Sequence, residues 1–195
     1  MGAEGAERQR ISVARWRDLE RTGEVRHDYI DGYIYAMAGG SRAHSAIAVN
    51  ALAMLHTVLG AGPCQVYTSD VATRVSPSRY TYADVVVTCA ADDQATRAAS
   101  EVVEPRVVIE VLSESTERQD RGRTWDDYRQ CASLQEYVLV GTEYQRVEVY
   151  RRTEQGWGLY HIYGPRDEVE LTSVSVRLPV ALLYQRTDVS VAPPE

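Results

Sequence analysis

Two acidic residues lie in strongly apolar segments of the sequence. Asp84 stands directly before the run Val85-Val-Val-Thr88, and Glu110 lies inside Val107–Leu112 with apolar neighbours on both sides. Burying a carboxylate in such a segment costs several kcal/mol unless the group is paired, hydrogen-bonded or bound to a metal. Asp84 and Glu110 are therefore the first candidates for a catalytic or metal-binding pair.

Two carboxylates that neighbouring strands bring together resist ionising at the same time near neutral pH. A divalent cation removes that conflict, and Mg2+ takes hard oxygen ligands at partly open sites in phosphoryl-transfer enzymes. We predict that Asp84 and Glu110 bind Mg2+ (or Mn2+), with the backbone carbonyl of Val111 as a third ligand. The alternative is that the two acids are unrelated, one exposed at a strand end and the other paired with Arg106 or a helix arginine.

A helix that follows Glu110 along the chain can bring further groups to this pair. The polar stretch 113–121 leads into a predicted helix that ends near Cys131. Residues that are three, four or eight positions apart on a helix lie on roughly one face. On this helix that face carries Asp120, Thr124, Asp127 and Tyr128.

Arg121 and Thr124 are the candidates for catalytic work on this helix. Arg121 can supply positive charge to a phosphate in its transition state, and Thr124 can hydrogen-bond a water molecule. Arg123 is expected to point elsewhere. The alternative is that Arg121 and Arg123 pair with Asp120 and Asp127 on a solvated face. His44 lies on another predicted helix, and a lone histidine of this kind is more often a packing or hydrogen-bonding residue than a site residue.

The order of helical and extended segments predicts a single α/β domain with a mixed sheet. We expect a hairpin around Asp31-Gly32, helices over about 12–22 and 42–59, a polar loop over 90–100, and a terminal helix or turn over 178–183. Strands are expected over 64–68, 71–75, 80–88, 106–112, 136–140, 146–151 and 158–163. Residues 1–10 are expected to be disordered, 11–186 to form the domain, and 187–195 to be a flexible tail.

The composition excludes several classes of chemistry. All 21 basic residues are arginine, so no Schiff-base lysine and no P-loop lysine is present. Gly39-Gly40 lacks the spacing of a dinucleotide-binding loop, and we therefore expect no nucleotide cofactor. The net charge of -7 argues against general polyanion binding but leaves room for a local arginine-lined site.

The three cysteines are Cys64, Cys89 and Cys131, an odd number at wide spacings without a CxxC pair. This pattern predicts reduced thiols, no zinc site and a cytoplasmic location. The acidic start of the chain has no apolar leader, and no apolar run reaches the ~18 residues needed for a membrane helix. We therefore expect no membrane association.

Several ordered segments resemble one known family. They include Tyr82 to Val87, Val108 to Thr116, Asp120 to Tyr128 and Leu134 to Val140, preceded by a hairpin segment from Arg26 to Ser41 and by His44 and Asn50. This series is similar to the Uma-two family of restriction endonucleases in the PD-(D/E)XK nuclease superfamily. The resemblance runs from about residue 12 to 185.

The resemblance implies a restriction endonuclease-like core, a central mixed sheet flanked by helices with an N-terminal hairpin. It implies that Asp84 and Glu110 are the metal-binding acids and that Asp28 occupies the position of a further family acid. It also implies hydrolysis of DNA phosphodiester bonds by metal-activated water, and a homodimer.

The sequence departs from the family at the catalytic lysine. The two positions that would carry this lysine are Leu112 and Thr124. The expected function is a Mg2+-dependent endonuclease. Its alternatives are a catalytically impaired nuclease-fold protein that acts as a nucleic-acid-binding or dimeric interaction module, and a structural homodimer with an unrelated role.

Overall fold

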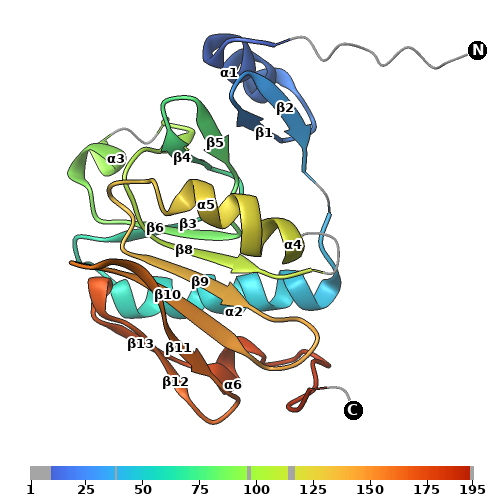
Figure 1. Ribbon diagram of the computed structural model, residues 1–195, viewed down its shortest axis with the longest axis vertical. Helices are drawn as coiled ribbons and strands as arrows, with labels where there is room; N and C mark the ends of the chain where they lie inside the picture. Colours follow the sequence, from blue (N-terminus) through green and yellow to red (C-terminus); the bar gives the residue numbers. More distant parts are fainter. Residues whose placement is uncertain (1–9, 38, 96–97, 114–116, 194–195) are drawn as a thin grey trace, which may run out of the picture.

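The computed structural model describes residues 10–37, 39–95, 98–113 and 117–193. A central sheet has the long helix α2 (Arg42–Leu59) along one face, and α4 (Glu117–Gln119) and α5 (Trp125–Tyr128) against the other (Figure 1). The mixed α and β architecture agrees with the prediction.

The central sheet has six strands in the order β11-β10-β9-β8-β6-β3. β8 and β9 are parallel, and every other neighbouring pair is antiparallel, so the sheet is mixed as predicted. The strands are β3 (Gln65–Thr68), β6 (Val85–Thr88), β8 (Pro105–Val111), β9 (Glu136–Val140), β10 (Val147–Thr153) and β11 (Gly156–Tyr163). The predicted hairpin of the last two is confirmed.

The alternation of side chains along β8 decides where Glu110 points. Val107, Ile109 and Val111 belong to the core packed against α2, whereas Val108 belongs to the core that contains Tyr128. Successive side chains of a strand point to opposite faces of a sheet. Glu110 therefore lies on the same face as Val108 and is directed toward the helical segment 117–128.

A second sheet has the order β2-β1-β5-β4-β7 and includes the predicted N-terminal hairpin. Asp31 (φ 51°) and Gly32 (φ 98°) form its turn, and two positive φ angles match the right-handed twist of the flanking strands. Helix α1 (Val13–Thr22) covers this sheet through Trp16. The strands are β1 (His27–Ile30), β2 (Tyr33–Ala36), β4 (Ala72–Ser76), β5 (Arg79–Thr81) and β7 (Glu101–Val102).

The predicted strand 80–88 is divided between the two sheets. β5 ends at Thr81 in the second sheet, and β6 begins at Val85 in the central sheet. Asp84 lies in the connection between them, immediately before β6. The switch of sheets places this carboxylate at the junction where the hairpin sheet meets the central sheet.

The helix after β8 differs from a regular α-helix. Residues 120–124 form a π-helical turn, η1 (Asp120–Thr124), between α4 and α5. A π-helical turn pairs residues five apart, whereas an α-helix pairs residues four apart. This turn therefore changes which side chains share a face, with consequences for the site.

Other elements were not expected from the sequence. The predicted loop 90–100 contains α3 (Ala91–Ala95), and the chain beyond β11 forms β12 (Glu168–Leu171), the 3-10 turn η2 (Thr172–Val174) and β13 (Val176–Pro179) before α6 (Val180–Leu183). The first residues of the expected flexible tail pack against the domain, because Val189 is buried and Ser190 forms an isolated β-bridge with Tyr144. Residues 1–9 of the expected disordered N-terminus lie outside the described residues.

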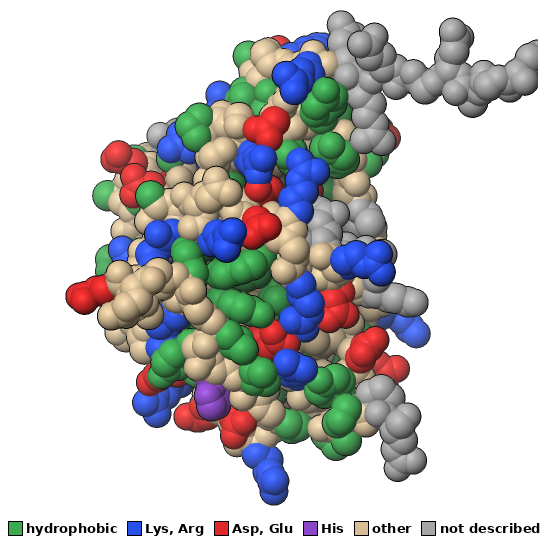
Figure 2. All heavy atoms as spheres, in the orientation of Figure 1, with side chains coloured by type: hydrophobic (Ala, Val, Ile, Leu, Met, Phe, Trp, Pro, Cys, Tyr) green, Lys and Arg blue, Asp and Glu red, His purple; other side chains and the backbone are tan. Residues whose placement is uncertain are grey.

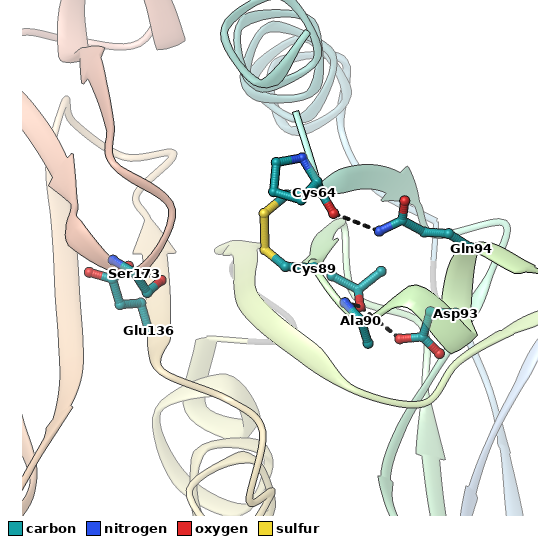
Figure 3. The surroundings of a disulfide bond; sticks show 9 residues. Cys64, Cys89, Ala90, Asp93, Gln94, Glu136 and Ser173 are labelled. Atoms are coloured by element: carbon teal, nitrogen blue, oxygen red, sulfur yellow. Dashed lines mark hydrogen bonds between the residues drawn. A yellow bond between two sulfur atoms is a disulfide. The ribbon is translucent and has the colours of Figure 1, made fainter. Parts of the chain in front are cut away.

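The prediction of three reduced cysteines is wrong for two of them. Cys64 and Cys89 form a disulfide (Figure 3), and Cys131 is free and buried. Gln65 of β3 pairs with Thr88 of β6, so the two cysteines are the next opposed pair of the ladder, with Cα atoms 4.0 Å apart. The two cysteines are 25 residues apart in the sequence and become neighbours only when the strands pair.

Within the described residues, no helix is long and apolar enough to cross a membrane.

Candidate active site

A cleft of about 550 Å³ lies between the N-terminal hairpin, the start of α2, the ends of β6 and β8, and the helical segment 117–128. It gathers most of the residues that the sequence singled out. The acids that line it are Asp28, Asp84, Glu110 and Asp120, the basic residues are His44, Arg118 and Arg123, and Val111 and Thr124 line it as well.

Asp84 and Glu110 are held together by reciprocal hydrogen bonds. The backbone amide of Asp84 donates to Oε2 of Glu110 over 3.3 Å, and the amide of Val111 donates to Oδ2 of Asp84 over 2.8 Å. Each acid is thus held by backbone from the other acid's segment. The alternative that the two acids are unrelated is excluded by this contact.

Glu110 is an electrostatically unfavourable carboxylate. Burial raises its pKa well above the ordinary value, and the nearby charges of Asp84 and Asp120 raise it further. The hydroxyl of Tyr128 on α5 donates to Oε1 of Glu110 over 3.2 Å, which opposes the rise in part. A positive charge beside these acids would stabilise the ionised form.

His44 lines the cleft, whereas the sequence favoured a packing or hydrogen-bonding role for this residue. Ser41 caps α2 and accepts a hydrogen bond from the amide of His44, so the imidazole projects from the first turn of the helix. Its Nε2 lies 3.1 Å from Oδ2 of Asp84. The hydrogen bond to Asp84 is the main cause that raises the pKa of His44, and the backbone of Val111 adds to the rise.

Asp28 lines the cleft from β1, as its family position implies. Burial raises its pKa to about 6, although hydrogen bonds from the Thr81 side chain and the Tyr82 backbone oppose the rise. Asp28 does not complete a metal cluster with the other acids. Among the residues that the structure describes, no group of three or more His, Cys, Asp or Glu side chains is placed to hold a metal ion.

The prediction that Arg121 serves the site is wrong. Its guanidinium forms two 2.8 Å hydrogen bonds with Glu148 and a 2.7 Å bond with Glu117, and it lines a different, smaller pocket. The acids of this pairing also differ from the expected Asp120 and Asp127. Glu148 is almost fully buried, so Arg121 is a structural counter-ion.

Arg118 and Arg123 take the place that Arg121 was expected to fill. Both line the cleft together with Thr124, and the guanidinium of Arg123 lies 5.9 Å from the centre of the Tyr35 ring. Arg123 was expected to point elsewhere because the prediction assumed regular α-helical spacing. The π-helical turn η1 alters that spacing, and this turn was not predicted from the sequence.

The donors in the cleft fit a divalent cation of the magnesium type. Mg2+ is usually bound through one or two carboxylates, with the remaining positions filled by water and substrate phosphate, so a third acidic side chain is not required. Asp84 and Glu110 supply two carboxylates whose mutual repulsion a cation would relieve. Oδ2 of Asp84 is already engaged by Val111 and His44, which leaves Oδ1 as its oxygen for a cation.

Comparisons with known proteins give two related sequences and one similar fold. The chain is 34% identical over 177 residues to the Synechocystis protein slr1290, covering 90% of this chain and 92% of that protein. It is 26% identical over 168 residues to the Synechocystis protein sll1609, covering 85% and 95%. The fold is similar to a crystal structure from Anabaena variabilis described as a "putative nuclease belonging to DUF820", with a TM-score of 0.67, 19% identity, and coverage of 83% and 91%.

The family model of Uma2, described as "Putative restriction endonuclease", matches residues 13–181. That span contains both carboxylates of the interlocked pair and every other residue of the cleft named above. The chain therefore belongs to the Uma2 family and has a restriction endonuclease-like fold.

Proposed function

We propose that this protein is a Mg2+-dependent (or Mn2+-dependent) nuclease that hydrolyses DNA phosphodiester bonds in the cleft. The observation that carries the proposal is the interlocked pair of Asp84 and Glu110, two acids that lie 26 residues apart in the chain and share backbone hydrogen bonds. Its membership of the Uma2 family supports the same activity.

The residues of the chain have separable roles in this proposal. Asp84 and Glu110 would hold the cation, and Val111, which also lines the cleft, would offer its backbone carbonyl as a further oxygen. A bound divalent cation would polarise a phosphate and make water a stronger nucleophile. His44 orients Asp84 through its 3.1 Å contact, and Tyr128 orients Glu110 from the opposite side.

One observation favours a second candidate, a nuclease-fold module with impaired catalysis. Leu112 is buried in the core below the cleft, and Thr124 carries no charge, so neither family lysine position has a cationic side chain. Such a protein would bind nucleic acid through the cleft without cutting it.

Plasmid nicking with Mn2+ separates the two candidates. The wild type, Glu110→Gln and Thr124→Lys are compared in one assay. Nicking by the wild type that Glu110→Gln abolishes supports the nuclease. Activity that appears only in Thr124→Lys identifies the impaired module. The proposal is wrong if none of the three proteins cuts DNA with Mn2+.

A further inference from the structure

The cleft has a surplus of negative charge that a nucleic acid must overcome. Its described lining contains four carboxylates, two arginines and His44. Arginines and acids alternate over the face that carries α4 and α5, without a broad field of one sign (Figure 2). A polyanion that enters this cleft therefore depends on local contacts rather than on the overall field of the protein.

Arg118 and Arg123 are the two guanidinium groups placed for such contacts. They are five residues apart, which on a regular α-helix would set them about 140° apart around the axis. The π-helical turn, which starts two residues after Arg118 and contains Arg123, pairs residues five apart and so brings the two side chains toward one face. The same turn leaves Arg121 on another face, where Glu148 binds it.

The surroundings of the two arginines differ from those of the structural arginine. Arg121 is held by the carboxylates of Glu117 and Glu148. In the described part of the chain, neither Arg118 nor Arg123 forms an ion pair with a carboxylate. The Tyr35 ring on β2 contacts Arg123 and orients its guanidinium without neutralising the charge.

We propose that Arg118 and Arg123 form a phosphate clamp, which binds the backbone phosphates of a nucleic-acid strand beside the Asp84–Glu110 pair. The identification of the strand as a substrate rests on the proposed nuclease function, whereas the clamp itself is a binding site. Guanidinium groups suit this role because they present paired donors to phosphate oxygens and remain charged at any physiological pH. The π-helical turn is the element that makes the clamp.

The test measures DNA binding apart from cleavage. Fluorescently labelled duplex and single-stranded DNA are titrated with the wild type, Arg118→Gln, Arg123→Gln, the double variant and Arg123→Lys, in Ca2+ over a series of salt concentrations. Arg129→Gln is the matched control, because Arg129 follows the same helix and pairs with Asp126 at the exposed surface. Circular dichroism verifies that each variant is folded.

Each single loss is expected to weaken binding on the order of tenfold at low salt and to reduce the salt slope by ~0.9 for duplex or ~0.7 for single strands. Arg123→Lys is expected to keep the wild-type salt slope because it keeps the positive charge. Arg129→Gln is expected to bind DNA like the wild type. Unchanged affinity and slope in the double variant overturn the clamp, even if the wild type cuts DNA. Arginine-dependent binding by a wild type that never cuts supports the clamp and refutes the nuclease. Absence of any DNA binding by the wild type overturns both.

Discussion

The amide of Asp84 donates a hydrogen bond to the carboxylate of Glu110, while the strand that carries Glu110 returns an amide hydrogen bond, from Val111, to the carboxylate of Asp84. Each acid thus fixes the other, and two carboxyl groups are held together at one end of β6 and β8. The fold keeps the two carboxyl groups together although burial and the neighbouring Asp84 raise the pKa of Glu110, which marks its ionised form as unfavourable. A bound cation would relieve the electrostatic cost of this arrangement in the free protein.

The first prediction concerns Glu110→Gln. This change should lower Mn2+-dependent nicking on the order of 100-fold or more, because it removes a charged ligand from the proposed site. It should also raise the free energy of unfolding at pH 7, since a neutral amide replaces a buried carboxylate whose pKa is raised. Urea unfolding and nicking on the same preparations provide both readings. Lower stability together with intact nicking would contradict the assigned role.

The second prediction is a pH dependence that arises from Asp28. Its pKa is about 6 in the folded protein, compared with ~3.9 in an unfolded chain. Well below the unfolded pKa of ~3.9 the carboxyl is neutral in both states, and burial of this group carries no charge penalty. As the pH rises to about 6 the unfolded chain ionises first, so this group lowers the free energy of unfolding by roughly 2 to 3 kcal/mol, and the loss persists at higher pH.

Asp28→Asn should remove that decline, because the amide does not ionise. The difference in unfolding free energy between variant and wild type, measured by urea titration from pH 4 to pH 8, should therefore grow between about pH 4 and pH 6 and then level off. A difference that is constant over this range would show that Asp28 titrates normally. Comparison of the two proteins cancels the contributions of the other ionising groups.

The third prediction concerns the attachment of the β12–β13 hairpin. Glu136 on β9 has no exposed surface and accepts hydrogen bonds from the amides of Thr172 and Ser173 while pairing with Arg151 (Figure 3 labels Glu136 and Ser173). Glu136→Gln leaves Arg151 without its counter-ion and should cost about 3 kcal/mol of unfolding free energy. Asp126→Asn, which breaks an exposed pair with Arg129, should cost less than ~1 kcal/mol. Equal effects of the two changes would refute this assignment.

The fourth prediction concerns the disulfide. Cys64–Cys89 closes a loop of moderate length, and its removal should cost about 3 kcal/mol. Reductant should therefore lower the Tm of the wild type but not that of the Cys64→Ser/Cys89→Ser variant. Alkylation of the denatured, unreduced wild type should modify Cys131 alone, as mass spectrometry would show. Modification of all three cysteines would contradict the disulfide.

Local patterns in the sequence were sufficient for most elements and for the two acids. The helix 42–59, the Asp31-Gly32 hairpin and the buried strand around Glu110 follow from periodicity and turn chemistry that act over a few residues. A carboxylate inside an apolar strand is visible in the sequence because its burial has to be compensated. The β12–β13 hairpin was missed because its strands are only four residues long, although each alternates buried and more exposed side chains.

The tertiary structure alone decided which residues meet. Strand pairing brings Cys64 to Cys89 and the Asp84 amide to Glu110, across 25 and 26 residues of chain. Helix α2 delivers His44 to Asp84 from yet another segment. The π-helical turn turns Arg118 and Arg123 toward the cleft and Arg121 toward Glu148. The physical reason is that the local sequence sets the type of an element, whereas the direction of each side chain depends on packing and hydrogen bonding against distant segments. The π-helical backbone of residues 120–124 is an example of such an adaptation.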